Sequence, residues 1–373
     1  MFQQNNVVLI GNSVAEQSKS IAHLNKRIIN IDSYNDRDLI GESYKNSDPC
    51  GLVNNEVITI LENLKLFKED TLIVVSSDYD KDNNYYELLK KYGYIVGNNY
   101  KNILKLKNID ELFYKLELNN IKYPEKINNI KNNHESLVLK NPYTSGGLGV
   151  RKIEKEDIKI PEKNEYYQKY IKGQTYSVLF MANSDKKFSI IGINQIFNKR
   201  TSFSDFCFSG ATSNIKFNKS VTKRLKYIIN FFVEEYNLIG LNGIDFILSD
   251  NIYFLELNPR ITQTCFMYDK NFKEGYVHAH IESDLNNDLT FNDNINDHFS
   301  SFETLFSNSS FIFNYEIENY DFVSNIPQIN THIEVGQPIC TISVTSEYEK
   351  KTKKILLDNI SLIKSKLKNI EII

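Results

Sequence analysis

The sequence has few of the features that mark exported, membrane-spanning or disulfide-linked proteins. Its 373 residues include no tryptophan, three methionines and four cysteines. No Cys-x-x-Cys pair occurs, so neither a disulfide framework nor a structural zinc site is expected from Cys50, Cys207, Cys265 and Cys340. No apolar run approaches the roughly 20 residues that a membrane helix needs, and the polar first residues lack a signal-peptide pattern. We expect a cytoplasmic protein with reduced thiols and no membrane partner.

An excess of positive charge is also missing. Lysine and arginine total 44 against 47 aspartates and glutamates, which gives a net charge of −3. Such a balance provides no basic field for a phosphate backbone, so a nucleic acid partner is not expected. The chain is 41% hydrophobic and 12% aromatic, so it should fold, and its length allows two or three domains.

Two common nucleotide-binding motifs are absent. The pattern Gly-x-x-x-x-Gly-Lys-Ser/Thr does not occur, which excludes a P-loop. The dinucleotide fingerprint Gly-x-Gly-x-x-Gly is represented only by Gly11, after a short apolar run. Asp32 stands where a ribose-binding acid could lie, but aspartates at strand ends are common in α/β folds. We therefore do not expect a dinucleotide site here.

Apolar periodicity predicts a mixed α/β and α+β fold. A βαβ unit with a parallel sheet is expected near the N-terminus, from strands 7–11, 27–32 and 71–76 and helices 13–24, 54–66 and 83–92. Helices 108–119 and 221–236 and strands 136–140, 166–171 and 176–181 follow, with a hairpin of 243–248 and 252–257 turned at 249–251. The tail predicts strands 311–316, 332–335 and 339–344 and a helix over 347–367.

A glycine-rich loop follows the predicted strand 136–140, whose last residue is Lys140. Glycines leave backbone N–H groups open to phosphate oxygens, and a nearby ammonium group can neutralise phosphate charge. The candidate loop residues are Ser145, Gly146, Gly147 and Gly149. The alternative is a tight hairpin turn without a ligand.

The predicted hairpin carries oxygen ligands on one face. Glu256 and Asn258 are two residues apart and so share a face, which Asp245 on the paired strand can join. Two carboxylates and an amide oxygen suit Mg²⁺, with phosphate oxygens completing its shell. Arg260 continues the same spacing and could hold a carboxylate or phosphoryl group. A solvated sheet face, and a structural ion pair for Arg260, are the alternatives.

Together with the segment Gln168-Lys169-Tyr170-Ile171, these residues resemble the ATP-grasp superfamily in their order along the chain. The resemblance implies a Rossmann-like domain over 1–100, an ATP-grasp nucleotide-binding and catalytic domain over 101–285, and a small α+β cap over 286–373. It also implies ATP and two Mg²⁺ ions as cofactors.

The resemblance assigns a role to each residue that matches a family motif. Lys140 contacts the α-phosphate and the adenine side of ATP, and the Ser145–Gly149 loop covers the β- and γ-phosphates. The backbone of Gln168, Lys169, Tyr170 and Ile171 reads the adenine edge. An earlier lysine of such proteins is matched by Lys107, with Lys105 as the alternative. Asp245, Glu256 and Asn258 match the Mg²⁺ ligands, and Arg260 matches the residue that steadies the transferred group.

The chain departs from the family pattern in two places. The acid that usually holds the ribose hydroxyls is replaced around Thr175 and Ser177, and Gln168 stands where glutamate is frequent. How the ribose is held is therefore left open.

The activity that the resemblance implies is ADP-forming ligation of a small-molecule carboxylate to an amine through an acylphosphate. Segments 30–38 and 324–342 are similar to ATP-grasp ligases found beside tetrahydromethanopterin and methanofuran one-carbon enzymes, where a tyramine–glutamate ligase step is one proposed role. A small-molecule kinase, a carboxylase and a non-catalytic ATP-binding regulator are the alternatives. A homodimer is the assembly considered.

The second substrate is expected between residues 201–214 and 262–280. Phe203, Phe206, Phe208 and Tyr268 could stack on an apolar substrate body, although such residues are also typical of a core. His278 and His280 alternate on a stretch that resembles a strand. With no third ligand nearby, we expect core or solvent-facing imidazoles there, not a second metal site.

Overall fold

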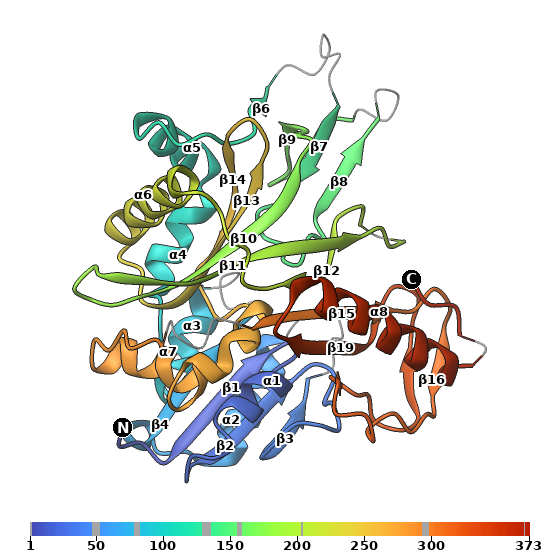
Figure 1. Ribbon diagram of the computed structural model, residues 1–373. Coiled ribbons are helices and arrows are strands. Elements are labelled where there is room, and N and C mark those ends of the chain that lie inside the picture. Colours follow the sequence, from blue (N-terminus) through green and yellow to red (C-terminus); the bar gives the residue numbers. More distant parts are fainter. Residues whose placement is uncertain are drawn as a thin grey trace.

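The computed structural model describes residues 2–46, 53–77, 83–128, 136–154, 159–202, 204–292, 298–368 and 370–373. Cys50 and Phe203 lie outside the described residues. The described part of the chain forms four sheets, of five, four, eight and two strands, with helices packed on them (Figure 1). In the part of the chain that is described, no helix is both long and apolar enough to cross a membrane.

The N-terminal part is a five-stranded parallel sheet with the order β3-β2-β1-β4-β5. Its strands are β1 (Asn6–Gly11), β2 (Arg27–Asp32), β3 (Glu42–Lys45), β4 (Thr71–Val75) and β5 (Tyr94–Ile95). β1 and β4 are buried along their whole length, as expected for central strands covered on both faces. The connecting helices are α1 (Ala15–Ser20), α2 (Asn54–Leu64) and α3 (Asn83–Leu89).

Helix α1 is shorter than the 13–24 predicted from the sequence. It ends where the backbone of Gly275 passes so close that an added Cβ would lie 2.3 Å from the Ser20 carbonyl oxygen. This tertiary contact, which the local apolar pattern does not contain, accompanies the turn of the chain toward β2.

A second, four-stranded sheet has the order β6-β9-β7-β8. It consists of β6 (Lys126–Ile127), β7 (Leu137–Lys140), β8 (Val150–Ile153) and β9 (Tyr166–Lys169), all paired antiparallel. Two helices, α4 (Tyr100–Lys107) and α5 (Ile109–Leu118), precede it. Each begins with an asparagine whose side chain accepts a backbone hydrogen bond: Asn99 from Lys101 and Asn108 from Glu111.

The largest sheet has eight strands in the order β14-β13-β10-β11-β12-β15-β19-β17. The first five in chain order are β10 (Gln174–Ala182), β11 (Phe188–Lys199), β12 (Cys207–Thr212), β13 (Gly240–Leu248) and β14 (Ile252–Asn258). The C-terminal part adds β15 (Phe299–Phe306), β17 (Val323–Ser324) and β19 (Pro338–Ser346), with β15 paired to β12. The C-terminal strands therefore extend the central sheet directly.

Helix α6 (Lys219–Tyr236) covers one face of this sheet because its apolar residues recur with helical spacing. Asn218 caps its first turn by accepting a hydrogen bond from the Val221 amide at 3.0 Å. The buried stripe consists of Leu225, Ile228, Ile229, Phe232, Val233 and Tyr236. At the C-terminus, α8 (Glu349–Lys366) packs on β15 and β19, and β16 (Phe311–Phe313) pairs with β18 (Thr331–Ile333).

The strand-like interpretation of the segment with His278 and His280 is wrong. Both lie on helix α7 (Gly275–Leu285), which packs on α1 and β13. His280 is buried, and its Nδ1 accepts a hydrogen bond from the Leu241 amide at 2.9 Å. The alternation of His278 and His280 resembled a strand, whereas packing against the sheet determined a helix.

Candidate functional site

Residues of all four sheets line a cavity of about 1080 Å³. This exceeds the ~300–1,000 Å³ typical of a site for one small ligand, so it has room for a nucleotide and a second small molecule. Most candidate residues from the sequence line it: Lys140, Ser145, Gly146, Gly147, Gln168, Lys169, Tyr170, Ile171, Asp245, Glu256, Asn258 and Arg260.

The predicted oxygen ligands meet on the hairpin of β13 and β14. Asp245 lies directly opposite Glu256 in the antiparallel register, beside a bulge. Asn258 Nδ2 donates to Asp245 Oδ2 at 3.1 Å, which leaves the amide oxygen of Asn258 for another partner. Burial raises the pKa of Asp245 to about 7, and the charge of Glu256 adds to this, while Arg260, the Asn258 hydrogen bond and Lys140 oppose it. Two facing carboxylates of this kind suit a cation.

The site supplies fewer protein ligands than a self-sufficient metal centre. Among the described residues, no group of three or more histidines, cysteines, aspartates or glutamates is placed to hold a metal ion. Mg²⁺ is commonly bound by one or two carboxylates together with substrate phosphates. The pair Asp245 and Glu256 with Asn258 therefore fits a cation that arrives with a phosphorylated ligand.

Lys140 and Lys107 line a small cavity together with Glu256. Lys140 ends β7, and its Nζ donates to the Leu255 carbonyl oxygen at 3.2 Å, beside Glu256. Lys107 ends α4, is half-buried, and donates to the Pro142 carbonyl oxygen at 2.7 Å. It lines that small cavity, whereas Lys105 is exposed. The geometry favours Lys107 over Lys105.

The glycine loop rests against β12. Gly146 and Gly147 have φ of +63° and +77°, which a side chain rarely adopts, and a Cβ on Gly147 would lie 2.0 Å from the Phe206 carbonyl oxygen. The Phe208 amide donates to the Gly146 carbonyl at 2.9 Å. Ser145, Gly146 and Gly147 line the cavity, while Gly149 packs against Thr144.

The segment of Gln168 to Ile171 runs along the cleft at the end of β9. The Gln168 side chain is buried and donates to the Pro124 carbonyl oxygen at 2.8 Å, so it holds the segment in place. The Tyr170 ring lies 6.3 Å from that of Phe206. Where a ribose-binding acid was missing from the sequence, Thr175 and Ser177 line the cavity with hydroxyl groups.

The aromatic residues predicted to contact a second substrate divide into two groups. Phe206 and Phe208 line the cavity. Tyr268 does not contribute, because it is 2% exposed and its hydroxyl donates to Asn194 Oδ1 at 2.7 Å and accepts from the Asn214 amide at 3.2 Å. Its interpretation as a stacking residue is corrected to a residue of the core.

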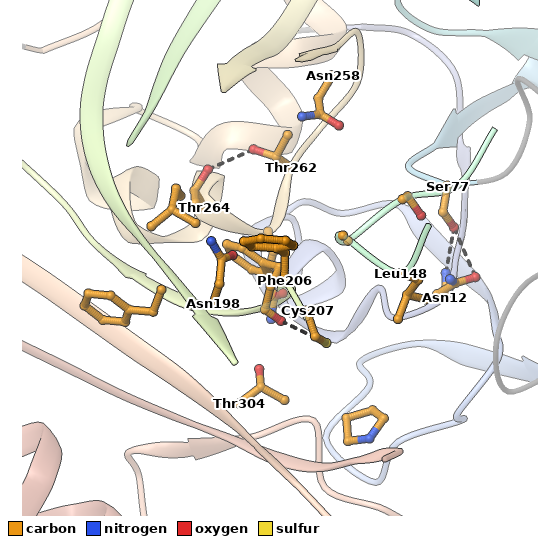
Figure 2. A pocket seen from close by; sticks show the side chains of 18 of the residues that line it. Asn12, Ser77, Leu148, Asn198, Phe206, Cys207, Asn258, Thr262, Thr264 and Thr304 are labelled. Carbon is orange, nitrogen blue, oxygen red and sulfur yellow. Dashed lines mark hydrogen bonds between the residues drawn. The ribbon is translucent and has the colours of Figure 1, made fainter. Parts of the chain in front are cut away.

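The sequence analysis missed a second end of the cavity, formed by polar residues after three apolar strands. These are Asn12 and Ser13 after β1, Ser33 after β2, and Ser76 and Ser77 after β4. Figure 2 shows Asn12 hydrogen-bonded to Ser77, with Phe206 and Thr304 also bordering the pocket. Ligands commonly bind at the carboxyl ends of parallel strands. Polar residues directly after the predicted strands could therefore have indicated this part of the site from the sequence.

Comparison with known families identifies the central part of the chain. Residues 108–264 match the ATP-grasp domain family. A protein of Methanocaldococcus jannaschii, named only as uncharacterised, is 27% identical over 291 residues, which cover 73% of this chain and 69% of that protein.

Three solved structures share the fold at low sequence identity. The biotin carboxylase domain of Hydrogenobacter thermophilus 2-oxoglutarate carboxylase, solved with MgADP and bicarbonate, has a TM-score of 0.72 at 13% identity and covers 100% of this chain and 91% of that one. N5-carboxyaminoimidazole ribonucleotide synthetase of Thermotoga maritima has a TM-score of 0.68 at 11% sequence identity, and the match covers 99% of both chains. The L-amino acid ligase of Bacillus licheniformis has a TM-score of 0.68 at 11% sequence identity, and the match covers 100% of this chain and 99% of that one.

Proposed function

Since this chain carries an ATP-grasp domain in an ATP-grasp fold, we propose that it is an ATP-dependent, ADP-forming ligase. The reaction joins a small-molecule carboxylate to an amine through an acylphosphate. The observation that carries the proposal is the set formed by Asp245, Glu256, Asn258 and Arg260 in one cleft with Lys140 and the glycine loop.

The residues present fit Mg²⁺ and ATP. Asp245, Glu256 and the amide oxygen of Asn258 would hold up to two Mg²⁺ ions, which supply charge neutralisation for the phosphates. Lys140, Lys107 and the N–H groups of the glycine loop would hold the phosphates, and the segment from Gln168 to Ile171 would border the adenine.

The proposed chemistry needs two displacements. A carboxylate oxygen attacks the γ-phosphorus, the bond to the β-phosphate oxygen breaks, and ADP leaves. The amine nitrogen then attacks the acyl carbon, inorganic phosphate leaves with the former carboxylate oxygen, and the nitrogen gives up a proton. Arg260 would stabilise the negative charge on the oxygen of the tetrahedral intermediate. Lys140 would offset charge that develops on the transferring phosphoryl group.

No nucleophilic side chain is required for this route. Two described cysteines, Cys207 and Cys340, line the cleft, and both are poorly suited to be one, because burial raises the pKa of each thiol. Burial raises the pKa of Cys207 to about 11, so its thiol stays protonated near neutral pH. A kinase or a carboxylase would use the same residues to bind ATP, and a non-catalytic regulator would bind ATP without turnover. A role in cofactor biosynthesis, similar to tyramine–glutamate ligation, and assembly as a homodimer are finer predictions within this proposal.

The test is release of ADP and phosphate from Mg-ATP across a matrix of carboxylates and amines that includes glutamate with tyramine. We expect release that requires both partners, and we expect Glu256→Gln and Arg260→Ala to lose it while keeping their melting temperatures. The matched controls are Glu234→Gln and Arg151→Ala, which change exposed residues outside the cavity lining. Near-normal turnover in both site variants would show that the site is assigned wrongly.

A further inference from the structure

The end of the cavity beyond the nucleotide residues lies at the carboxyl edge of β1, β2 and β4. The first turn of α1 and the loop after β2 also border it, through Glu16, Gln17 and Asp36. This end carries several acids and few bases. The hydrogen-bond and ion-pair partners of each acid show which of them could still bind a ligand.

Three of the acids are engaged within the protein. Asp32 Oδ2 accepts a hydrogen bond from the Val14 amide at 2.7 Å, and its Oδ1 accepts two more from backbone amides of the following turn. Glu16 and Asp38 share one cation, because Lys19 Nζ lies 2.9 Å from Glu16 Oε1 and 2.6 Å from Asp38 Oδ2. Asp38 also accepts backbone hydrogen bonds from the segment 325–326. These three carboxylates hold the loop, the helix and the C-terminal part together.

Asp36 differs from them. It is 4% exposed, and its Oδ2 is buried without a hydrogen-bond partner in the described part of the chain. Gln17 is 7% exposed, and its Oε1 lacks a partner in the same way. Both residues line the cavity, so two acceptors without donors occur at one end of it. A buried acceptor without a donor is costly, and a buried carboxylate without a counter-charge more so.

The charges around Asp36 increase the need for a cation. Burial raises the pKa of Asp36 well above its usual range, Asp32 and Asp38 raise it further, and Lys19 alone opposes them. Lys19 is already held by two other acids. The neighbouring Arg37 turns away, since its Nε donates to the Pro327 carbonyl oxygen at 2.8 Å and its guanidinium pairs with Glu318.

We propose that the substrate bound at this end carries a protonated amino group, which Asp36 and Gln17 hold. An ammonium group matches the site better than a metal ion, because one carboxylate and one amide oxygen are too few ligands and no metal-holding group occurs among the described residues. Gln17 on α1 and Asp36 after β2 belong to the part of the chain that forms the N-terminal sheet, whereas Glu256 and Arg260 lie on and just after β14 in the eight-stranded sheet. The amino group is thus a recognition group, separate from the atoms that react, and the substrate has at least two functional groups.

This inference rests on the proposed ligase only in calling the bound molecule a substrate, so binding and turnover are measured separately. Calorimetry with Mg-ADP present would compare 5-aminopentanoate with hexanoate, glutamate with glutarate, and 1,4-diaminobutane with pentylamine. In each pair a methyl group or a hydrogen replaces one ammonium group. We expect at least one amino compound to bind at least ~10-fold more tightly than its partner, as for a charge-assisted hydrogen bond.

The variant Asp36→Asn should lose this preference while its affinity for Mg-ADP stays unchanged. Its melting temperature should not fall, because the Oδ2 atom of Asp36 has no hydrogen-bond partner among the described residues. Glu334→Gln is the matched control, since Glu334 is an exposed acid that lines the same cavity, and it should keep the preference.

Equal binding of the amino compounds and their partners that lack the ammonium group, binding by no amino compound at millimolar concentration, or an unchanged preference in Asp36→Asn would overturn the inference. If the preference is found but no carboxylate–amine pair releases ADP, the ligase proposal fails and the amino-group site stands. If ADP is released equally with analogues that lack the ammonium group, the ligase proposal stands and the amino-group site fails.

Discussion

Replacing Asn98 with alanine would test how the end of the hairpin is held beside the cleft. Asn98 lies between β5 and α4 and is 2% exposed. Its Nδ2 donates to Asn242 Oδ1 at 2.8 Å and to the Pro259 carbonyl oxygen at 2.9 Å, and its Oδ1 accepts from the Ile239 amide at 2.8 Å. Pro259 separates Asn258 from Arg260, so one buried side chain ties the link between the domains to the backbone of the proposed catalytic residues.

The expected loss in the free energy of unfolding follows from the polar groups that lose their hydrogen-bond partner. The variant removes the donor to Asn242 Oδ1 and the acceptor of the Ile239 amide, both inside the protein. At about 1–3 kcal/mol for each of these two groups, the free energy of unfolding should fall by about 2–6 kcal/mol. Turnover should fall as well, since misplacement of catalytic groups by about 1 Å can cost ~100-fold in rate. Urea denaturation and the rate of ADP release would measure the two effects.

The neighbouring Asn99→Ala variant is the control. Asn99 is exposed and caps α4 by accepting a hydrogen bond from the Lys101 amide at 2.9 Å. Loss of an N-cap costs about 1 kcal/mol and should leave turnover unchanged, because Asn99 makes no contact with the hairpin in the described hydrogen bonds. Equal stability and full turnover in both variants would refute the reasoning about Asn98.

Three further predictions concern the loop, a buried histidine and the C-terminal strands. Gly147→Ala should lower kcat/KM for ATP more than Gly146→Ala in steady-state assays, because both glycines have positive φ but only Gly147 meets the Phe206 carbonyl oxygen. Burial lowers the pKa of His280 to about 4 from its usual 6.5. Below pH ~6.5 the unfolded chain therefore binds a proton that the folded protein does not. The free energy of unfolding should fall by up to about 3 kcal/mol between pH ~6.5 and ~4. If the urea midpoints of His280→Gln change with pH as steeply as those of the unchanged protein, this prediction is wrong. Ending the chain near Ser300 should give insoluble protein in expression trials, because β15 and β19 continue the central sheet, and a soluble, active product would contradict it.

Local patterns predicted the elements that are regular along the chain. The βαβ unit, the hairpin around Asp250 and helix α6 follow from apolar spacing and turn residues, and the structure confirms them. Asp245 and Glu256 could be placed together from the sequence because a short turn fixes the register of a hairpin. The strand prediction around His278 was wrong because the alternation of two histidines does not distinguish a helix from a strand.

Contacts between distant segments could not be derived from local patterns. Strands β11, β12 and β15 were not expected, and the pairing of β12 with β15 joins residues about ninety positions apart. The prediction placed Tyr268 at the cleft because it follows the end of the hairpin closely in the sequence. Its burial against Asn194 depends on the fold of β11, which the local sequence does not contain. The partnerless oxygen of Asp36 depends on which neighbouring acids Lys19 and the backbone satisfy, and no sequence pattern contains that information.

The proposed acylphosphate route is tested most directly by following a carboxylate oxygen. A carboxylate substrate labelled with ¹⁸O would be turned over with Mg-ATP and the amine, and the nucleotide and phosphate products analysed by mass spectrometry. The account predicts ADP without label and inorganic phosphate that carries one ¹⁸O atom from the carboxylate. Label in AMP, or phosphate without label, would contradict it.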